Sequence, residues 1–252
     1  MRRRMIYLLG IFIFFGTLIG VPLAIYTRKV PTCFDGIQNQ GETDIDRGGP
    51  CVLLDERVLL ADTVLWARGF TVRPGEYNAV AYVLNPNGGA GTERVDYKFS
   101  LYDVQNILVA EDVGSTYIMP GAVTPVFNGG IKTGNRRAAH TIFTFTSKPI
   151  WKRMANTADN ITVSNKVVTD VGTVPRISAV VKNLDVKDIT NVTLVATVFD
   201  TAGNAFASSR TLVPSLAGGE ETTVVFTWPN PFTSVVGQID ILPLHPPVIS
   251  NK

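Results

Sequence analysis

The side chains best suited to chemistry lie between the two cysteines of the chain, Cys33 and Cys51. The segment they bound is rich in closely spaced side-chain oxygen atoms, the kind of ligand that Ca²⁺ prefers, although the spacing is not that of an EF-hand. The candidate calcium ligands are Asp35, Asn39, Glu42, Asp44 and Asp46. In the alternative interpretation, the segment is a solvated spacer whose Asp and Asn side chains cap turns. The sequence leaves both interpretations open.

The two cysteines allow one intramolecular disulfide, between Cys33 and Cys51. Disulfides persist in oxidising compartments, so an extracytoplasmic location permits this bond. It would constrain the unfolded loop by roughly 3 kcal/mol. We therefore expect a disulfide-tied acidic stalk if this part of the chain lies outside the cytoplasm.

Residues for catalysis are sparse elsewhere. His140 and His245 are the only histidines, and neither lies in a metal-ligand pattern. Catalysis also requires an oriented partner, so we expect both to be surface or strand-end residues. Asp103 and Asp200 occupy equivalent places before two turns, and we expect their carboxylates to bind turn amides. The chain is therefore predicted not to be an enzyme, and calcium is the one cofactor considered.

Lys132, Arg136 and Arg137 form a small basic loop. Such a loop could contact an anionic glycan or a lipid head group. More commonly it is a soluble hairpin tip, because charged loops are usual at protein surfaces. The Gly-rich segment 85–91 joins two predicted strands and precedes no helix, so a phosphate-binding loop is not expected.

An uncharged run of 22 residues, Met5–Tyr26, predicts the element that would place these groups at a membrane. At about 1.5 Å per residue, a helix of this length crosses a hydrocarbon core of ~30 Å. Arg2–Arg4 precede the run, and Arg28 and Lys29 follow it, so the positive-inside rule predicts a cytoplasmic N-terminus. The alternative is a cleaved signal peptide, whose apolar region would be shorter and end at a small-x-small site. We expect an uncleaved, single-pass anchor.

The charge balance changes when the anchor is set aside. The 252 residues carry a net charge of +2, but residues 30–252 hold 18 basic and 21 acidic side chains, a balance of about −3. A nucleic-acid-binding protein needs a basic face. We therefore expect an extracytoplasmic protein that does not bind nucleic acid.

The remainder of the chain predicts β-structure, because β-branched and aromatic residues alternate in short runs between turn residues. The clearest strands are Asn78–Leu84, Val95–Tyr102, Thr141–Thr146, Arg176–Lys182, Val192–Phe199 and Thr222–Trp228.

The β-region also repeats itself. Asn78–Asn85 is similar to Arg176–Asn183, and Tyr97–Asp103 is similar to Leu194–Asp200, at offsets of 98 and 97 residues. A period near 100 residues, with about seven short strands, predicts two tandem immunoglobulin-like sandwiches. Thr141–Pro149 aligns with Thr222–Pro231 at a smaller offset, which predicts an extra loop near 127–139 in the first copy.

The predicted organisation has four parts. These are a basic tail and anchor over 1–29, an acidic stalk over 30–56, a first sandwich over 57–153 and a second over 154–252, which ends in a Pro-rich tail. Lys148–Asp159 is expected to be a short tether between the sandwiches. We expect Trp66 and Trp151 in the first core or at the domain junction, and Trp228 in the last strands of the second domain.

Two motifs carry a resemblance to known families. The run Phe99-x-Leu101-Tyr102-Asp103 resembles the FxLYD domain of bacterial membrane-anchored proteins. The cysteine segment resembles a bacterial surface module, C-x-D-G-x-x-N-x-x-E-T-x-x-D-C-G-G-x-C-x-x-C, although Arg47 and Leu54 replace two of its cysteines. The residues that match the module are Cys33, Asp35, Gly36, Asn39, Glu42, Thr43, Asp46, Gly48, Gly49 and Cys51. Loss of that cysteine pair implies that Cys33 bonds Cys51.

The sequence thus predicts a non-enzymatic protein of the cell membrane whose β-sandwiches bind an envelope protein or act as a scaffold. A passive spacer or assembly subunit of an envelope complex is the alternative. An accessory glycan-binding module is the third and weakest candidate.

Overall fold

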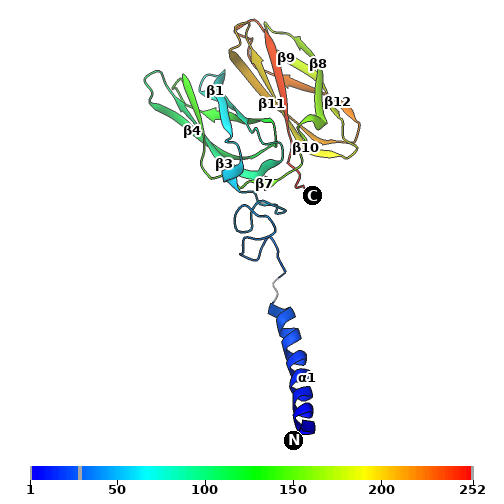
Figure 1. Cartoon of the computed structure of the whole chain (residues 1–252). Coiled ribbons are helices and arrows are strands. Elements are labelled where there is room, and N and C mark those ends of the chain that lie inside the picture. Colours follow the sequence, from blue (N-terminus) through cyan, green and yellow to red (C-terminus); the bar gives the residue numbers. More distant parts are fainter. Residues whose placement is uncertain (1, 28–29, 251–252) are drawn as a thin grey trace. The chain divides into compact units, whose positions relative to one another are not determined.

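The computed structural model describes residues 2–27 and 30–250, and in it an all-β region follows one N-terminal helix (Figure 1). The chain divides into two compact units, one ending at Cys51 and the other beginning at Val52. The predicted fold class is confirmed: the helix is followed by two immunoglobulin-like β-sandwiches.

Helix α1 (Arg2–Thr27) contains the uncharged run, and its described side chains are exposed. Its 26 residues extend about 39 Å at 1.5 Å per residue. The segment Arg3–Ile25 is long and apolar enough to cross a membrane. Arg28 and Lys29, which enter the predicted orientation, lie outside the described residues.

The first sandwich consists of two antiparallel sheets. One has the order β1-β2-β5, and the other has the order β4-β3-β6, with β7 paired to the start of β3. Their bounds are β1 (Thr63–Arg73), β2 (Glu76–Leu84), β3 (Ala90–Tyr102), β4 (Leu108–Ile118), β5 (Val123–Lys132), β6 (His140–Phe145) and β7 (Lys152–Arg153), with a short 3₁₀ turn, η1, at Glu56–Val58.

The second sandwich repeats this topology. Its sheets have the orders β8-β9-β12 and β11-β10-β13. The bounds are β8 (Ile161–Thr169), β9 (Arg176–Asn183), β10 (Ile189–Phe199), β11 (Ala205–Leu216), β12 (Glu221–Thr227) and β13 (Gln238–Leu244), preceded by a 3₁₀ turn, η2, at Ala158–Asn160.

The strand pairing corrects the predicted alignment of the two copies. Val80 pairs with Phe127, and Ser178 pairs with Val225, so both members of this pair are offset by 98 residues. The strand of the second sandwich that is equivalent to β5 is therefore β12. The predicted strand Thr222–Trp228 corresponds to β5 rather than to β6. The predicted extra loop near 127–139 was wrong over its first half, which belongs to β5. The error arose because β6 and β12 both combine Thr, Phe and β-branched aliphatic residues, a composition that many strands of a sandwich share.

Alternation of side chains builds a separate core in each sandwich. In the first, Tyr97, Phe99 and Leu101 point inward from β3. In the second, Leu194, Ala196 and Val198 do so from β10. Trp228, predicted in the last strands of the second domain, directly follows β12 and packs in the second core. Trp151 is buried beside the start of β3, within the first sandwich as predicted.

A buried asparagine fixes the same turn in both copies. The Asn85 amide donates to the carbonyl oxygens of Ala90 (2.7 Å) and Met119 (3.0 Å). The equivalent Asn183 donates to Lys187 (2.8 Å) and Leu216 (3.0 Å). Both side chains are fully buried, so their hydrogen bonds replace those that the surrounding carbonyls would make with water.

The two sandwiches pack face to face rather than end to end (Figure 1). The outer face of β1-β2-β5 contacts the outer face of β11-β10-β13, and a third hydrophobic cluster lies between them. Its buried members are Phe70, Val80, Tyr82, Val195 and Ala205, and Trp66, Val123, Phe127, Phe199 and Leu242 pack against them. Trp66 therefore belongs to the domain junction.

Polar contacts cross the same junction. Arg68 donates to the carbonyl oxygen of Ala205 at 2.7 Å, and the Arg210 guanidinium lies 5.3 Å from the centre of the Phe127 ring. Burial between the sandwiches raises the pKa of Tyr82. Apolar packing and directional bonds therefore both join the two sandwiches.

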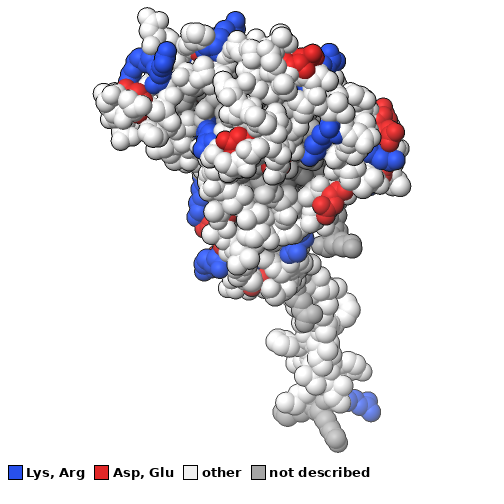
Figure 2. All heavy atoms as spheres, turned by 90° about the horizontal axis from the view of Figure 1, so that it is seen from above, with Lys and Arg blue, Asp and Glu red and all other residues white. Residues whose placement is uncertain are grey.

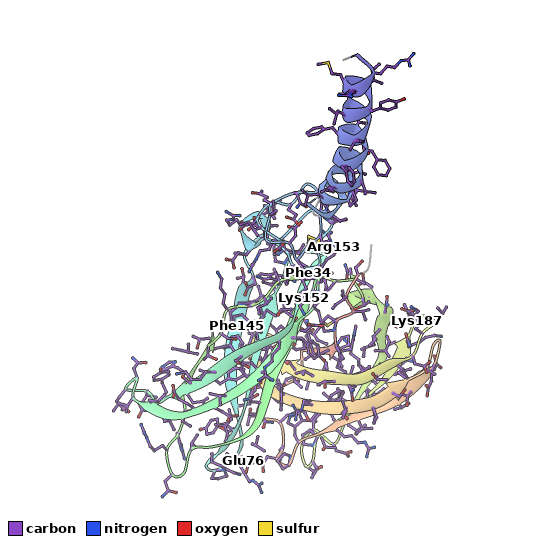
Figure 3. The ribbon with its side chains drawn as sticks, turned by 90° about the horizontal axis from the view of Figure 1, so that it is seen from below. Phe34, Glu76, Phe145, Lys152, Arg153 and Lys187 are labelled. Atoms are coloured by element: carbon purple, nitrogen blue, oxygen red, sulfur yellow. A yellow bond between two sulfur atoms is a disulfide. The ribbon has the colours of Figure 1, made fainter. Side chains whose placement is uncertain are left out.

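The predicted tether is a packed element. Lys152 and Arg153 form β7, Met154 is buried, and isolated bridges join Leu53 to Lys152 and Met154 to Ile249. The chain entering the first sandwich, the linker and the C-terminal segment thus lie side by side. Lys152 and Arg153 lie at the opposite end of the first sandwich from Glu76 (Figure 3). We call the arrangement of the three segments around Leu53, Lys152–Met154 and Ile249 the clasp.

Candidate functional site

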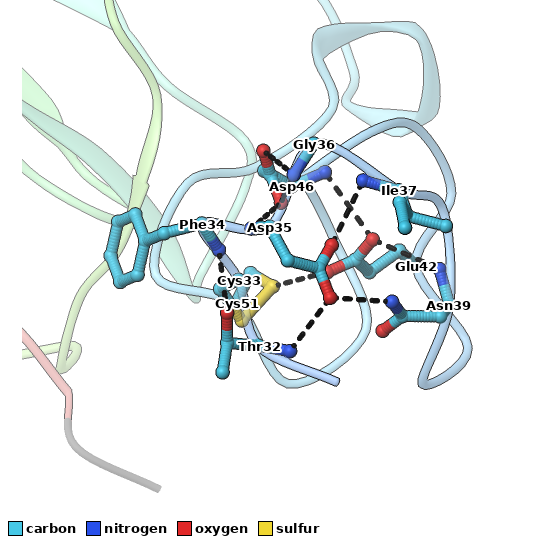
Figure 4. The surroundings of a disulfide bond; sticks show 10 residues. All are labelled: Thr32, Cys33, Phe34, Asp35, Gly36, Ile37, Asn39, Glu42, Asp46 and Cys51. Carbon is cyan, nitrogen blue, oxygen red and sulfur yellow. Dashed lines mark hydrogen bonds between the residues drawn. A yellow bond between two sulfur atoms is a disulfide. The ribbon is translucent and has the colours of Figure 1, made fainter. Parts of the chain in front are cut away.

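Cys33 and Cys51 form a disulfide at the centre of the acidic loop (Figure 4). Both sulfur atoms and the Glu42 carboxylate lie within 4.8 Å of one another, and in the described ranges this is the one such group of three His, Cys, Asp or Glu side chains. A thiolate is the form of cysteine that binds metal. Because the two sulfur atoms are bonded to each other, this cluster is not a thiolate metal centre.

The predicted calcium ligands form hydrogen bonds within the loop (Figure 4). Asp46 accepts from the amides of Asp35 (3.1 Å) and Gly36 (3.1 Å). Glu42 accepts from the amides of Asn39 (3.2 Å) and Asp46 (3.3 Å). Such bonds are the turn-capping chemistry of Asp and Asn.

The remaining predicted ligands act similarly. Asp35 accepts from the amide of Ile37 (2.8 Å) and from the side-chain amide of Asn39 (2.9 Å), and Asp44 accepts from the amide of Ile45 (2.9 Å). The hydrogen bonds that these carboxylates accept within the loop therefore fit the spacer interpretation. Calcium binding stays a prediction, and calorimetry with millimolar Ca²⁺ tests it: heat that Asp46→Asn abolishes would establish a site.

Two glycines shape the loop. Gly48 has a φ of 72°, and a Cβ there would lie 2.3 Å from the Thr43 hydroxyl oxygen. Gly49 has a φ of 50°, and a Cβ there would lie 2.8 Å from the carbonyl oxygen of Gly41. L-residues with side chains are disfavoured in this region of φ. The Gly-Gly pair therefore allows the chain to turn back toward Cys51.

The predicted turn role of the paired aspartates is confirmed. Asp103 accepts from the amides of Gln105 (3.0 Å) and Ile107 (2.9 Å). Asp200 accepts from the amides of Ala202 (2.9 Å) and Asn204 (2.8 Å). These backbone bonds lower the pKa of both carboxyls. Because each aspartate caps a turn in its own sandwich, the two are not an acid–base pair.

The basic loop is largely committed to contacts within the first sandwich. Lys132 lies 2.6 Å from the Glu76 carboxylate, and Arg136 lies 3.1 Å from that of Asp103. Arg136 also donates to the carbonyl oxygen of Leu108 at 2.7 Å. Two of the three cations that could contact an anionic ligand, Lys132 and Arg136, therefore bind groups of neighbouring strands instead.

The histidines differ from each other. His140 is the exposed first residue of β6, as predicted, but His245 is only 2% exposed. Its ring nitrogens lie 3.2 Å from the carbonyl oxygen of Pro246 and 3.3 Å from that of Thr157. His245 directly follows the end of β13, so it fits the strand-end alternative of the prediction but not the surface one, because the C-terminal segment packs onto the linker.

A cleft at the domain junction was not predicted. It encloses about 280 Å³ between β1, the start of β11 and the segment that follows β12. Its aromatic rings are Phe70, Phe206, Trp228 and Phe232. Phe232 contacts the other two aromatic residues of its own sandwich edge-to-face, with ring centres 5.4 Å from Phe206 and 5.1 Å from Trp228.

Polar bonds across the junction hold the walls of the cleft. The Asn78 side-chain amide donates to the carbonyl oxygen of Ser208 at 3.3 Å, and that of Asn230 donates to Val72 at 2.5 Å. No ionisable side chain lines the cleft. Concave, mostly apolar sites of this kind are preferred ligand sites at domain interfaces. The sequence signal was the aromatic-rich run 228–232, but its partners on β1 and β11 are distant in sequence.

No family model and no curated protein matches the chain. The FxLYD resemblance therefore stays a prediction. Among solved structures, the chain is similar to a red sea bream transglutaminase at 11% identity and a TM-score of 0.24, covering 75% of this chain and 32% of that one. It is also similar to a Bacteroides uniformis β-glucuronidase at 14% identity and a TM-score of 0.20, covering 69% and 22%. The chain thus spans a third or less of each enzyme, and likenesses this low carry no functional argument.

Proposed function

We propose that this chain is a non-enzymatic, membrane-anchored protein whose two sandwiches form a rigid extracytoplasmic module for binding a partner or for scaffolding the envelope. The observation that carries the proposal is the junction cleft, which is concave, aromatic and held between two packed domains. A ligand site gains affinity when its walls are already in place, because less motion is lost on binding.

The first unit supports the predicted location. The helix α1 is long and apolar enough to serve as the anchor, and the Cys33–Cys51 disulfide is a bond that persists outside the reducing cytoplasm. Protease treatment of intact cells or spheroplasts tests the orientation. We expect loss of the sandwiches and survival of the N-terminal segment, and full protection of the sandwiches would contradict it.

The surface supports a partner other than nucleic acid. On the face seen in Figure 2, basic and acidic side chains are interspersed, with no broad area of basic charge. Several of the cations are paired, as are Lys98 with Glu111 and Arg94 with Asp96. A phosphate backbone requires a basic face instead.

Crosslinking in the native membrane tests the module. A photoreactive residue at Thr233, on the rim of the cleft, is compared with one at Val186, which is 91% exposed and does not line the cleft. We expect a specific adduct from Thr233 alone. Adducts of equal yield from both positions, or from neither, would contradict a binding role for the cleft.

The second candidate is a passive spacer. The observation that favours it is the packed clasp together with the disulfide-tied loop, since both stiffen the chain without offering a ligand surface. The absence of any adduct at the cleft, together with a loss of envelope integrity on deletion of both sandwiches, would favour the spacer.

A further inference from the structure

The junction cleft excludes charged ligands. None of its lining residues is ionisable, and Phe70, Trp228 and Ala207 are buried in its walls. Moving a charged group into such a site removes its water without supplying a counter-charge, which is strongly unfavourable. The ligand that fits this cleft is therefore neutral.

The aromatic rings offer a flat apolar surface. Phe232 is half-buried, and its edge-to-face contacts with Phe206 and Trp228 leave part of its ring uncovered. The face of an aromatic ring is negatively polarised and attracts C–H groups that carry a small positive charge. The C–H groups of a sugar ring have this property, because each carbon bears an oxygen.

Hydroxyl groups supply most of the polar side chains on the rim of the cleft. Thr71, Thr227 and Thr233 are exposed at the cleft. Hydroxyl groups both donate and accept, so they match the hydroxyl groups of a sugar. The Asn78 carboxamide, in contrast, donates to Ser208 and accepts from the amide of Gly130 (3.2 Å). The second carboxamide of the cleft, Asn230, donates to the carbonyl oxygen of Val72.

The geometry points to an uncharged saccharide as the ligand of the junction cleft, one ring resting on Phe232 within the hydroxyl rim. The volume of about 280 Å³ suits a compact ligand. A neighbouring groove shares Phe232 and Thr233 with the cleft and continues past Val171 and Val235, which provides a path for further sugar units. This inference rests on the proposed function, because it names the ligand of the same module.

Saturation-transfer NMR on the full chain in lipid nanodiscs tests the ligand. The probes are N-acetylglucosamine, glucose, galactose and their β1,4-linked dimers, compared with glucuronic acid and a polyproline peptide. We expect transfer to at least one neutral saccharide and none to glucuronic acid. Phe232→Leu removes the ring face and should weaken binding about twofold to tenfold. Thr233→Val removes one hydroxyl and should weaken it by about threefold.

Matched controls separate the cleft from general effects. Phe34→Leu changes an exposed phenylalanine of the acidic loop, and Thr223→Val changes an exposed threonine of β12 that does not line the cleft, so neither should alter binding. No transfer to any neutral saccharide, equal binding of glucuronic acid, or equal loss in the controls would overturn the saccharide. Binding of the polyproline peptide that Phe232→Leu removes would also overturn it, but would leave the proposed binding module intact.

Discussion

The two sandwiches share one topology but present opposite faces to each other. The first uses its β1-β2-β5 face, and the second uses its β11-β10-β13 face. Each copy therefore holds, on its solvent side, the counterpart of the face that its neighbour buries. The residue types at these equivalent positions differ, so the free faces are not copies of the buried ones.

Some junction positions of the first copy are polar in the second. Val80 and Trp66 lie in the junction, whereas the equivalent positions of β9 and β8 hold Ser178 and Ser164. Reciprocally, Val195 is buried in the second copy, and the equivalent Lys98 of the first forms an ion pair with Glu111 at 2.7 Å. These polar side chains make the two free faces chemically unlike the faces that meet in the junction.

The largest expected effect comes from placing a charge in the junction. Val80→Asp buries an unpaired carboxylate at a position that is 0% exposed, and we expect a loss of about 3–5 kcal/mol in the free energy of unfolding. The equivalent Ser178→Asp lies on the free face and should cost less than about 0.5 kcal/mol. Denaturant unfolding measures both. Equal losses would contradict the assignment of the two faces.

Removal of the buried asparagines tests what the copies share. Asn85→Ala and Asn183→Ala each leave buried carbonyl oxygens without donors, and we expect a loss of about 2–3 kcal/mol for either. Asn135→Ala, at an exposed position, is the control. If only one of the two buried variants were destabilised, the turn would not have the same role in both sandwiches.

The turn aspartates should differ by one contact. Asp200→Ala removes turn hydrogen bonds and should lower the Tm by about 2–4 °C. Asp103→Ala also removes the ion pair with Arg136, so its effect should be at least as large. Differential scanning calorimetry measures both, and an unchanged Tm for Asp200→Ala would refute the turn role.

The largest acid sensitivity from a single carboxyl is expected in the first sandwich, at Glu76. Hydrogen bonds from Arg73 and Lys132 lower the pKa of Glu76 to about 2, and the equivalent position in the second copy is Val174. A lowered carboxyl pKa stabilises the fold at pH values above the unfolded pKa, and the contribution is lost as the pH falls toward 2. Glu76→Gln should therefore lower the Tm slightly at pH 7 and leave it unchanged near pH 2. A constant difference across this range would contradict the assignment.

The sequence predicted most of the fold because its signals are local. Alternating β-branched residues, the uncharged run and the repeated Asn and Asp turns are each read from one continuous stretch of sequence. The alignment of β12 with β6 instead of β5 shows the limit of such patterns, since several strands of a sandwich are rich in Thr, Phe and β-branched residues. The junction escaped prediction for a different reason. A face that looks half-polar, such as the one carrying Tyr82 and Arg68, gives no sign of which surface covers it.

The candidate sites divide in the same way. The role of Asp103 follows from a turn of five residues, so the spacing alone predicted it. The junction cleft requires Phe70 of β1 to meet Phe232 of the second sandwich, more than 150 residues later. The burial of His245 likewise depends on the C-terminal segment returning to the linker. Contacts between residues so distant in sequence depend on tertiary packing, and no local sequence pattern predicts them.

The clasp determines how the molecule responds to mechanical load. The chain enters the sandwich module at Val52, whose carbonyl oxygen accepts from the Arg153 amide at 2.6 Å, and Arg153 in turn accepts from the Ser250 amide at 3.1 Å. Tension applied at Val52 is thus shared with the linker and with the far end of the chain. Both sandwiches are connected to the same three-segment arrangement. A pulling force at Val52 therefore acts on both sandwiches together and not on one after the other. Unravelling one of them first requires the clasp to open.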